Sequence, residues 1–284
     1  MKEAVIVSTA RTGIGRAIRG SLNATRSPSM TAHVISHAVA RSGVDPAEIE
    51  DVVIGCVLAA GTAGGNLARN ALLAAGLPAS VSGHTIDRQC ASGLMAVATA
   101  AKQVMVDGMD IVVAGGHDNI TAVQEGYIAW VAKDKDVQVL AHSPHAYMPM
   151  LQTAEYVAKK YGITREAQDR YALASQQRTA AAQAAGRFDA EIVPFSTSMN
   201  VIDKTSNKVT VQPVTLSQDE GNRPDTTLDG LMSLKPVIEG GVVTAGNASQ
   251  LSDGASACVI MDSSLAQRRG IAPMGIYRGM AVSG

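Results

Sequence analysis

The sequence has three cysteines, no excess of charge of either sign and no long apolar run, and each absence excludes a class of protein. Cys56, Cys90 and Cys258 are widely spaced, odd in number and without a C-x-x-C pattern. They therefore predict neither a disulfide framework nor a zinc site. The formal net charge of −1 leaves no basic footprint for nucleic acid or an anionic membrane. No apolar run approaches the length of a membrane span.

The chain begins M-K-E-A-V-I-V, which leads directly into a strand pattern and lacks the features of a cleavable signal peptide. Together with the few cysteines, this start predicts a reducing, cytoplasmic location. A length of 284 residues with 46% hydrophobic residues is enough for a large core and suggests two domains.

Strands and helices alternate in the first part of the chain. Apolar runs predict strands over 3–9, 51–57 and 110–115, and helical periodicity predicts helices over 31–42 and 67–75. Alternation of this kind predicts an α/β fold with a mostly parallel sheet covered on both faces.

The pattern changes after about residue 117. Residues 126–150 have no clear period, and helices are predicted over 147–161 and 165–185, the second capped by Thr164. A strand is predicted over 188–193, followed by a polar, turn-rich stretch over 197–229 that reads as an excursion over an active-site face. The α/β pattern returns at Gly241, where 255–261 predicts a central strand.

Residues 84–107, H-T-I-D-R-Q-C-A-S-G-L-M-A-V-A-T-A-A-K-Q-V-M-V-D, read as a short strand, a sharp turn and a long helix. The helix is predicted from apolar residues spaced by three and four, beginning with Leu94 and Val97. Free backbone N–H groups and the positive end of the helix dipole favour an anion near Cys90. A cysteine in this place is a candidate nucleophile, whereas a cysteine elsewhere is more often a buried core residue.

D-R-Q-C-A-S-G-L resembles the nucleophile motif of the thiolases, commonly N-R-x-C-x-S-G. Three further segments resemble the family in the same order: the opening strand and arginine turn at 5–15, the loop-domain helix and exit strand at 169–194, and the coenzyme A loop V-T-A-G-N-A-S-Q-L-S-D-G-A-S-A at 243–257. The resemblance covers essentially the whole chain. It implies a thiolase-like α/β fold: an N-terminal domain formed by 1–118 and 241–270, an inserted α+β loop domain over 119–240, and the start of a second α/β half over 271–284.

The resemblance also implies an activity. Thiolases form or cleave 3-ketoacyl-CoA, and Cys90 matches the cysteine that carries the acyl group. Ala245 and Ser249 match positions of the coenzyme A loop, and Met150 matches a methionine beside the pantetheine. Acyl-CoA and coenzyme A are then the substrates, no metal or redox cofactor is implied, and a homodimer or homotetramer is expected.

This sequence departs from the family pattern at four positions, Asp87, Pro149, Leu151 and Gln250. The second half, with its G-H-P histidine and C-x-G cysteine, is not found in these residues, so we expect about 100–150 further residues in the active protein. Two alternatives stay open: a condensing enzyme of the ketoacyl-synthase kind, and a non-catalytic acyl-CoA-binding or interaction protein.

Six histidines offer other chemistry. His84 precedes Cys90 by six residues and is a conceivable base for it, although a place in the strand is favoured. His33 and His37 are spaced i, i+4 on a predicted helix, but no third ligand accompanies them. We expect these two to be surface or packing residues.

Overall fold

The computed structural model describes residues 2–203 and 205–283 and divides into two compact units. The first unit contains residues 1–124, 189–220 and 251–284, and the second contains 125–188 and 221–250. Among the described residues, no helix has the length and apolar character needed to cross a membrane. The three-part domain division stays a prediction.

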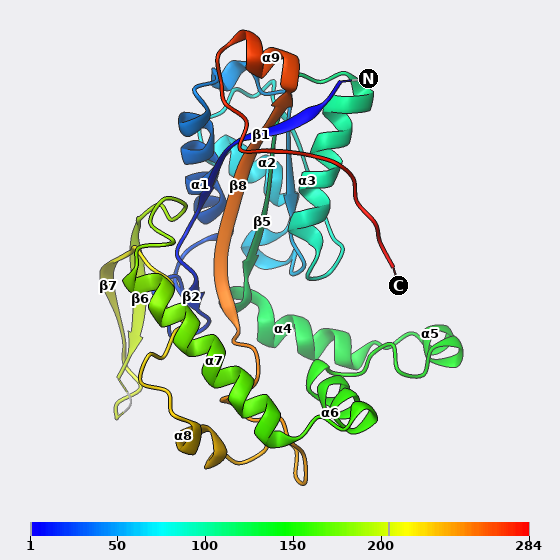
Figure 1. Cartoon of the computed structure of the whole chain (residues 1–284), viewed down its shortest axis with the longest axis vertical. Helices are drawn as coiled ribbons and strands as arrows, with labels where there is room; N and C mark the ends of the chain where they lie inside the picture. Colours follow the sequence, from blue (N-terminus) through cyan, green and yellow to red (C-terminus); the bar gives the residue numbers. More distant parts are fainter. Residues whose placement is uncertain (1, 204, 284) are drawn as a thin grey trace. The chain divides into compact units, whose positions relative to one another are not determined.

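The first unit is built on a seven-stranded sheet in the order β4-β3-β5-β8-β1-β9, with β2 paired to β8 (Figure 1). Its strands are β1 (Ala4–Arg11), β2 (Gly15–Arg16), β3 (Asp51–Gly55), β4 (Ser82–Ile86), β5 (Ile111–Asn119), β8 (Ser252–Asp262) and β9 (Gly275–Ile276). β3 is parallel to both β4 and β5, whereas β8 runs antiparallel to its neighbours β5 and β1. The predicted α/β fold is confirmed, with parallel pairing among β4, β3 and β5, and 255–261 does lie in a central strand.

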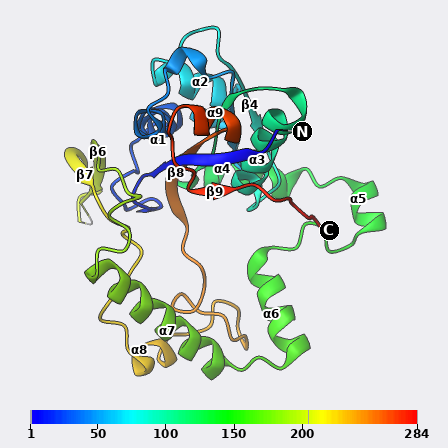
Figure 2. The same ribbon diagram turned by 45° about the horizontal axis from the view of Figure 1, so that its top comes forward.

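Helices cover both faces of this sheet (Figure 2). α1 (Ser27–Ser42) and α2 (Leu67–Ala74) bury one face together with Val52 and Ile54 of β3. α3 (Ser92–Lys102) buries the other face together with Val53, the residue between them. Since successive side chains of a strand point to opposite faces, one apolar run supplies both layers.

The remaining elements of the first unit are short. They are the 3₁₀ turns Pro46–Glu48 and Gly61–Ala63, a π-helical turn Gln103–Asp107 that continues α3, the antiparallel hairpin of β6 (Phe195–Ile202) and β7 (Val209–Leu216), and α9 (Ser263–Arg268). The predicted strand 188–193 is wrong: only Ile192 makes a bridge, to Arg11, and the strand β6 begins after Pro194. Proline has no N–H to donate to a ladder, which separates the two segments.

The second unit is mainly helical. It contains α5 (Val137–His142), α6 (Met150–Tyr161), α7 (Arg165–Ala184) and α8 (Leu228–Met232), and α4 (Ile120–Lys133) leads into it. The Thr164 hydroxyl accepts a hydrogen bond from the Ala167 N–H at 3.2 Å, which is the predicted N-cap of α7. The helices α4 and α5 fall where the sequence has no clear period.

Candidate active site

Cys90 lies on the turn between β4 and α3, and its side chain is exposed. The other two cysteines, Cys56 and Cys258, are buried, and all three are free thiols. Burial raises the pKa of Cys56 and of Cys258 to about 12, which keeps both thiols protonated at neutral pH. Cys90 is therefore the cysteine of this chain that a dissolved electrophile can reach.

The turn that carries Cys90 is held by its own side chains. The Ser92 hydroxyl accepts a hydrogen bond from the Arg88 N–H at 2.8 Å and donates one to the Gln89 carbonyl at 2.6 Å. The Asp87 carboxylate accepts a bond from the Gln89 N–H at 2.7 Å. Gln89 has a φ of 48°, a left-handed conformation that costs free energy in a residue with a Cβ. These contacts present Cys90 at a sharp, tightly bonded corner.

The predicted free N–H groups at the start of α3 are partly engaged. The Ala91 N–H donates to the Arg88 carbonyl at 3.1 Å, and the Ser92 N–H donates to the Gln89 carbonyl at 2.9 Å. Two N–H groups that the sequence pattern predicted to be free for an anion thus donate to carbonyls within the turn. Leu94, expected on the packed face, is 68% exposed, because the alanines of α3 and Val104 of the π-helical turn after it make the contact with the sheet.

The carboxyl ends of the parallel strands β3, β4 and β5 meet beside this turn. The Cys56 N–H, just after β3, donates to the Ile86 carbonyl at the end of β4 at 3.0 Å. Near the end of β5, the Asp118 carboxylate accepts hydrogen bonds from the N–H groups of Val57 at 3.4 Å and Leu58 at 3.0 Å. Burial, and to a smaller extent the charge of Asp87, raise the pKa of Asp118. A half-buried carboxylate therefore fixes the loop after β3.

Three glycines let α3 approach the sheet at this edge: Gly55 at the end of β3, Gly116 in β5 and Gly93 in α3. A Cβ on Gly55 would lie 2.2 Å from the Ser92 carbonyl carbon, and one on Gly116 would lie 3.2 Å from the Gly93 Cα. The backbone of the first turn of α3 thus rests directly on the strands. Glycine at the end of an apolar strand pattern signals such an approach, although the sequence does not reveal its partner.

His84 contacts a carboxylate at the start of the neighbouring strand. It lies on β4, and its Nδ1 is 3.2 Å from Oδ2 of the buried Asp51 at the start of β3. His33 and His37 contact each other edge-on, and His33 also contacts Phe195. In the part of the chain that the structure describes, no group of three or more His, Cys, Asp or Glu side chains is placed to hold a metal ion.

The other three predicted site residues belong to the second unit. Met150 is the first residue of α6 and is 78% exposed. Ala245 and Ser249 are exposed in the loop that follows α8. Cys90 belongs to the first unit, so the grouping of all four residues around one substrate stays a prediction.

The loop that carries Ala245 and Ser249 is tied to α7 by buried polar contacts. The Asn247 amide donates to Oδ1 of Asp169 at 2.9 Å, and the Arg165 guanidinium donates to Oδ2 of the same carboxylate at 2.7 Å. Asp169 is fully buried, and Asn247 also accepts a bond from the Thr244 N–H at 2.7 Å. A loop held in this way presents its exposed side chains in a fixed arrangement.

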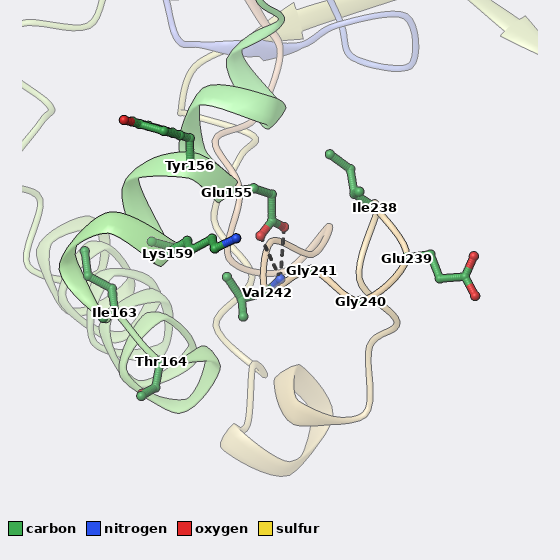
Figure 3. A pocket seen from close by; sticks show the side chains of 12 residues that line it. Glu155, Tyr156, Lys159, Ile163, Thr164, Ile238, Glu239, Gly240, Gly241 and Val242 are labelled. Atoms are coloured by element: carbon green, nitrogen blue, oxygen red, sulfur yellow. Dashed lines mark hydrogen bonds between the residues drawn. The ribbon is translucent and has the colours of Figure 1, made fainter.

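An open pocket of about 710 Å³ also lies in the second unit, between α6 and residues 238–242 (Figure 3). The Glu155 carboxylate accepts hydrogen bonds from the N–H groups of Val242 at 2.9 Å and Val243 at 2.8 Å, and Lys159 extends toward the same turn. None of the four predicted site residues lines this pocket. The Glu155 carboxylate of this pocket is already engaged in holding the turn.

The comparison with protein families decides the family to which this fold belongs. Residues 4–264 match the family model described as the thiolase N-terminal domain. The chain belongs to the thiolase family. The nucleophile, loop-domain and coenzyme A motifs all lie within the matched residues, so the resemblance inferred from the sequence is confirmed at the level of the family.

Individual relatives agree with this membership. The thiolase chain is 42% identical to a 3-ketoacyl-CoA thiolase of Bacillus subtilis, over all of this chain and 72% of the relative. It is 42% identical to an acetyl-CoA acetyltransferase of Cupriavidus necator, with the same coverage. It is 38% identical to a peroxisomal 3-ketoacyl-CoA thiolase of Petunia hybrida, over 99% of this chain and 60% of that relative.

Proposed function

We propose that this chain is part of an acyl-CoA C-acyltransferase that forms or cleaves 3-ketoacyl-CoA through an acyl group carried on Cys90. The observation that supports this most directly is an exposed cysteine at a braced strand-to-helix turn in a chain of the thiolase family. The proposal concerns the whole protein, and this chain spans 72% of each of the two bacterial relatives named above.

In the degradative direction, the Cys90 thiolate attacks the 3-keto carbon of the substrate. The bond between C2 and C3 then breaks, the acyl group stays on sulfur as a thioester, and acetyl-CoA leaves as an enolate that takes up a proton. The thiolate of coenzyme A next attacks the thioester and releases a shortened acyl-CoA. The reverse sequence forms the carbon–carbon bond. A thiol suits both directions because it is nucleophilic near neutral pH and its thioester is an activated acyl donor.

Coenzyme A is proposed to contact the second unit through Met150, Ala245 and Ser249. The exposed Ser249 hydroxyl would hydrogen-bond the pantetheine, and the small Ala245 would let it approach the loop backbone. Such remote contacts hold the thioester in place for transfer. The reaction moves an acyl group and a proton, so we propose that it needs neither a metal nor a redox cofactor.

The experiment that tests this proposal is intact-mass analysis of the protein before and after addition of acetyl-CoA. We expect one added acetyl group on the wild type and none on Cys90→Ala. His84→Ala serves as a control and should acylate like the wild type, because His84 contacts Asp51. A protein that binds acetyl-CoA but never gains the acetyl group would refute the enzyme proposal and leave the acyl-CoA-binding alternative.

Assembly and location are separate proposals. We infer a homodimer or homotetramer from the family resemblance, and size-exclusion chromatography with light scattering measures the subunit number. A monomer at micromolar concentration would contradict it. A cytoplasmic location stays a prediction, since the relatives include both bacterial and peroxisomal proteins, and fractionation of the source cells tests it.

A further inference from the structure

The first turn of α3 rests on the last residue of β3 without any side chain between them. A Cβ added to Gly55 would lie 2.2 Å from the Ser92 carbonyl carbon, 2.3 Å from its oxygen and 2.5 Å from the Gly93 nitrogen. All three atoms belong to the backbone, so no side-chain rotation can relieve the overlap. A Cβ at Gly55 would have to move the helix start or the strand by at least about 0.8 Å, the distance from 2.2 Å to the 3.0 Å that real Cβ contacts require.

The neighbouring contacts are close but less severe. A Cβ on Gly116 would lie 3.2 Å from the Gly93 Cα, and a Cβ on Gly93 would lie 3.5 Å from the Gly116 Cα, which is an ordinary contact distance. The contact between α3 and the sheet can therefore be perturbed in two graded steps. A side chain at Gly55 would give a large displacement, and one at Gly116 a small one.

The strand side of this contact cannot yield easily. Gly55 pairs with Ile86 of β4 on one side and with Gly116 of β5 on the other. The interior of the sheet is close-packed, and a shift of β3 would disturb both apolar layers at once. The helix start is therefore the part that moves.

Movement of the helix start reaches the nucleophile through Ser92. The Ser92 hydroxyl bonds to the backbone of Arg88 and Gln89, and the Ser92 N–H bonds to the Gln89 carbonyl. These residues flank Cys90 on its N-terminal side. A displaced Ser92 carries the whole turn with it.

We propose that Gly55 is a positioning residue for Cys90. The absence of a side chain at the end of β3 sets the depth at which α3 sits on the sheet, and this depth places the sulfur relative to the bound thioester. The inference rests on the proposed function, in which Cys90 accepts the acyl group. Gly116 lies at the same contact between α3 and the sheet and has a smaller part in positioning Cys90.

The test compares two variants that differ in the size of the overlap, Gly55→Ala and Gly116→Ala. Gly275→Ala is the matched control, because its Cβ would meet no atom within 4 Å in the same unit. The full chain is mixed with acetyl-CoA at increasing concentration, and single-turnover acetylation is followed by mass. Thiol titration checks that Cys90 stays accessible, and urea unfolding measures the stability of each variant.

We expect the saturating acetylation rate to fall about 100-fold in Gly55→Ala, the cost of a misplacement near 1 Å. It should fall several-fold in Gly116→Ala and stay unchanged in Gly275→Ala. The acetyl-CoA concentration that gives half of the maximal rate should be the same in all variants, since none of them changes the coenzyme A loop. If Gly55→Ala does not fold, Gly116→Ala decides alone.

Two failures are distinguishable. A wild type that never acetylates would refute the proposed function. If the wild type does acetylate, the variants alone test the role of Gly55. A folded Gly55→Ala variant that acetylates at the wild-type rate would refute the positioning role. So would a Gly116→Ala variant that loses stability without any loss of rate, because glycine would then serve packing alone.

Discussion

His117 is a buried imidazole with no hydrogen-bond partner among the residues that the structure describes, and its removal should change how stability depends on pH. The side chain lies on β5 and is 4% exposed. Neither ring nitrogen meets a donor or acceptor among the described residues. Burial lowers the pKa of His117 to about 4 from its ordinary 6.5. We consider the variant His117→Met, which keeps an adaptable side chain of similar size and removes the titrating group.

The sign of the effect follows from proton linkage. The folded protein keeps His117 neutral down to about pH 4, whereas the unfolded chain takes up a proton below about pH 6.5. The free energy of unfolding is therefore unaffected by His117 above pH 6.5 and decreases as the pH falls toward 4. At 1.36 kcal/mol per unit of pKa shift, the loss amounts to about 3 kcal/mol at the acid end.

Urea unfolding at pH 7.5, 6.5, 5.5 and 4.5 measures the effect for the wild type and for His117→Met. Asp118 and Asp253 have raised pKa values and act in the opposite sense, since their protonation favours the folded state as the pH falls. Both proteins share these groups, so the difference between the two curves isolates His117. The difference should widen by about 2.5 kcal/mol between pH 7.5 and 4.5.

A matched variant separates titration from burial of a polar group. His117→Gln keeps a buried polar side chain that does not titrate. It should therefore lose the pH dependence that His117 causes and keep, at pH 7.5, the cost of burying a polar group without a hydrogen-bond partner. His117→Met should be more stable than His117→Gln at every pH by about 1–3 kcal/mol, the cost of an unsatisfied buried polar group. Wild-type and His117→Met curves that run parallel from pH 7.5 to 4.5 would refute the reasoning.

Three further changes are testable. Gln89→Gly removes the cost of a left-handed φ and should raise the free energy of unfolding by about 1 kcal/mol in urea titration, and a loss of stability would contradict this. Asp169→Ala leaves Arg165 without its buried partner and should cost about 3 kcal/mol, seen as earlier cleavage of the second unit in limited proteolysis; unchanged cleavage would argue against it. Ser249→Ala should weaken acetyl-CoA binding about 5-fold by calorimetry while alkylation of Cys90 stays constant, and equal affinity would exclude the proposed hydrogen bond.

Much of the fold could be predicted from local signals. The helix α2 begins at Leu67 as predicted, and α7 begins after its Thr164 cap. The helices α4 and α5 could not, because periodicity reports burial on one face. Trp130 of α4 and Val137 of α5 are largely exposed in the structure, so no buried stripe marks these helices in the sequence.

The candidate site likewise has a part that the sequence predicts and a part that it does not. Cys90 is predictable because the residues that make its turn, from Asp87 to Ser92, are adjacent in the chain. Gly55 and Asp118 are not, because their contacts join residues far apart in the sequence. Such contacts arise only when parallel pairing brings the ends of β3 and β5 to one edge.

The division between local and distant residues also explains how this turn can stay rigid while its cysteine stays exposed. A nucleophile that must meet a large thioester cannot be fixed by burying its own side chain. Its position has to come from the backbone on either side, and backbone is held most firmly by other backbone. The Ser92 hydrogen bonds hold the turn on itself, and Gly55 lets the helix behind it rest directly on a paired strand. Because the backbone around it is held by contacts with other backbone, the exposed sulfur can be placed accurately without any contact that a substrate would have to displace.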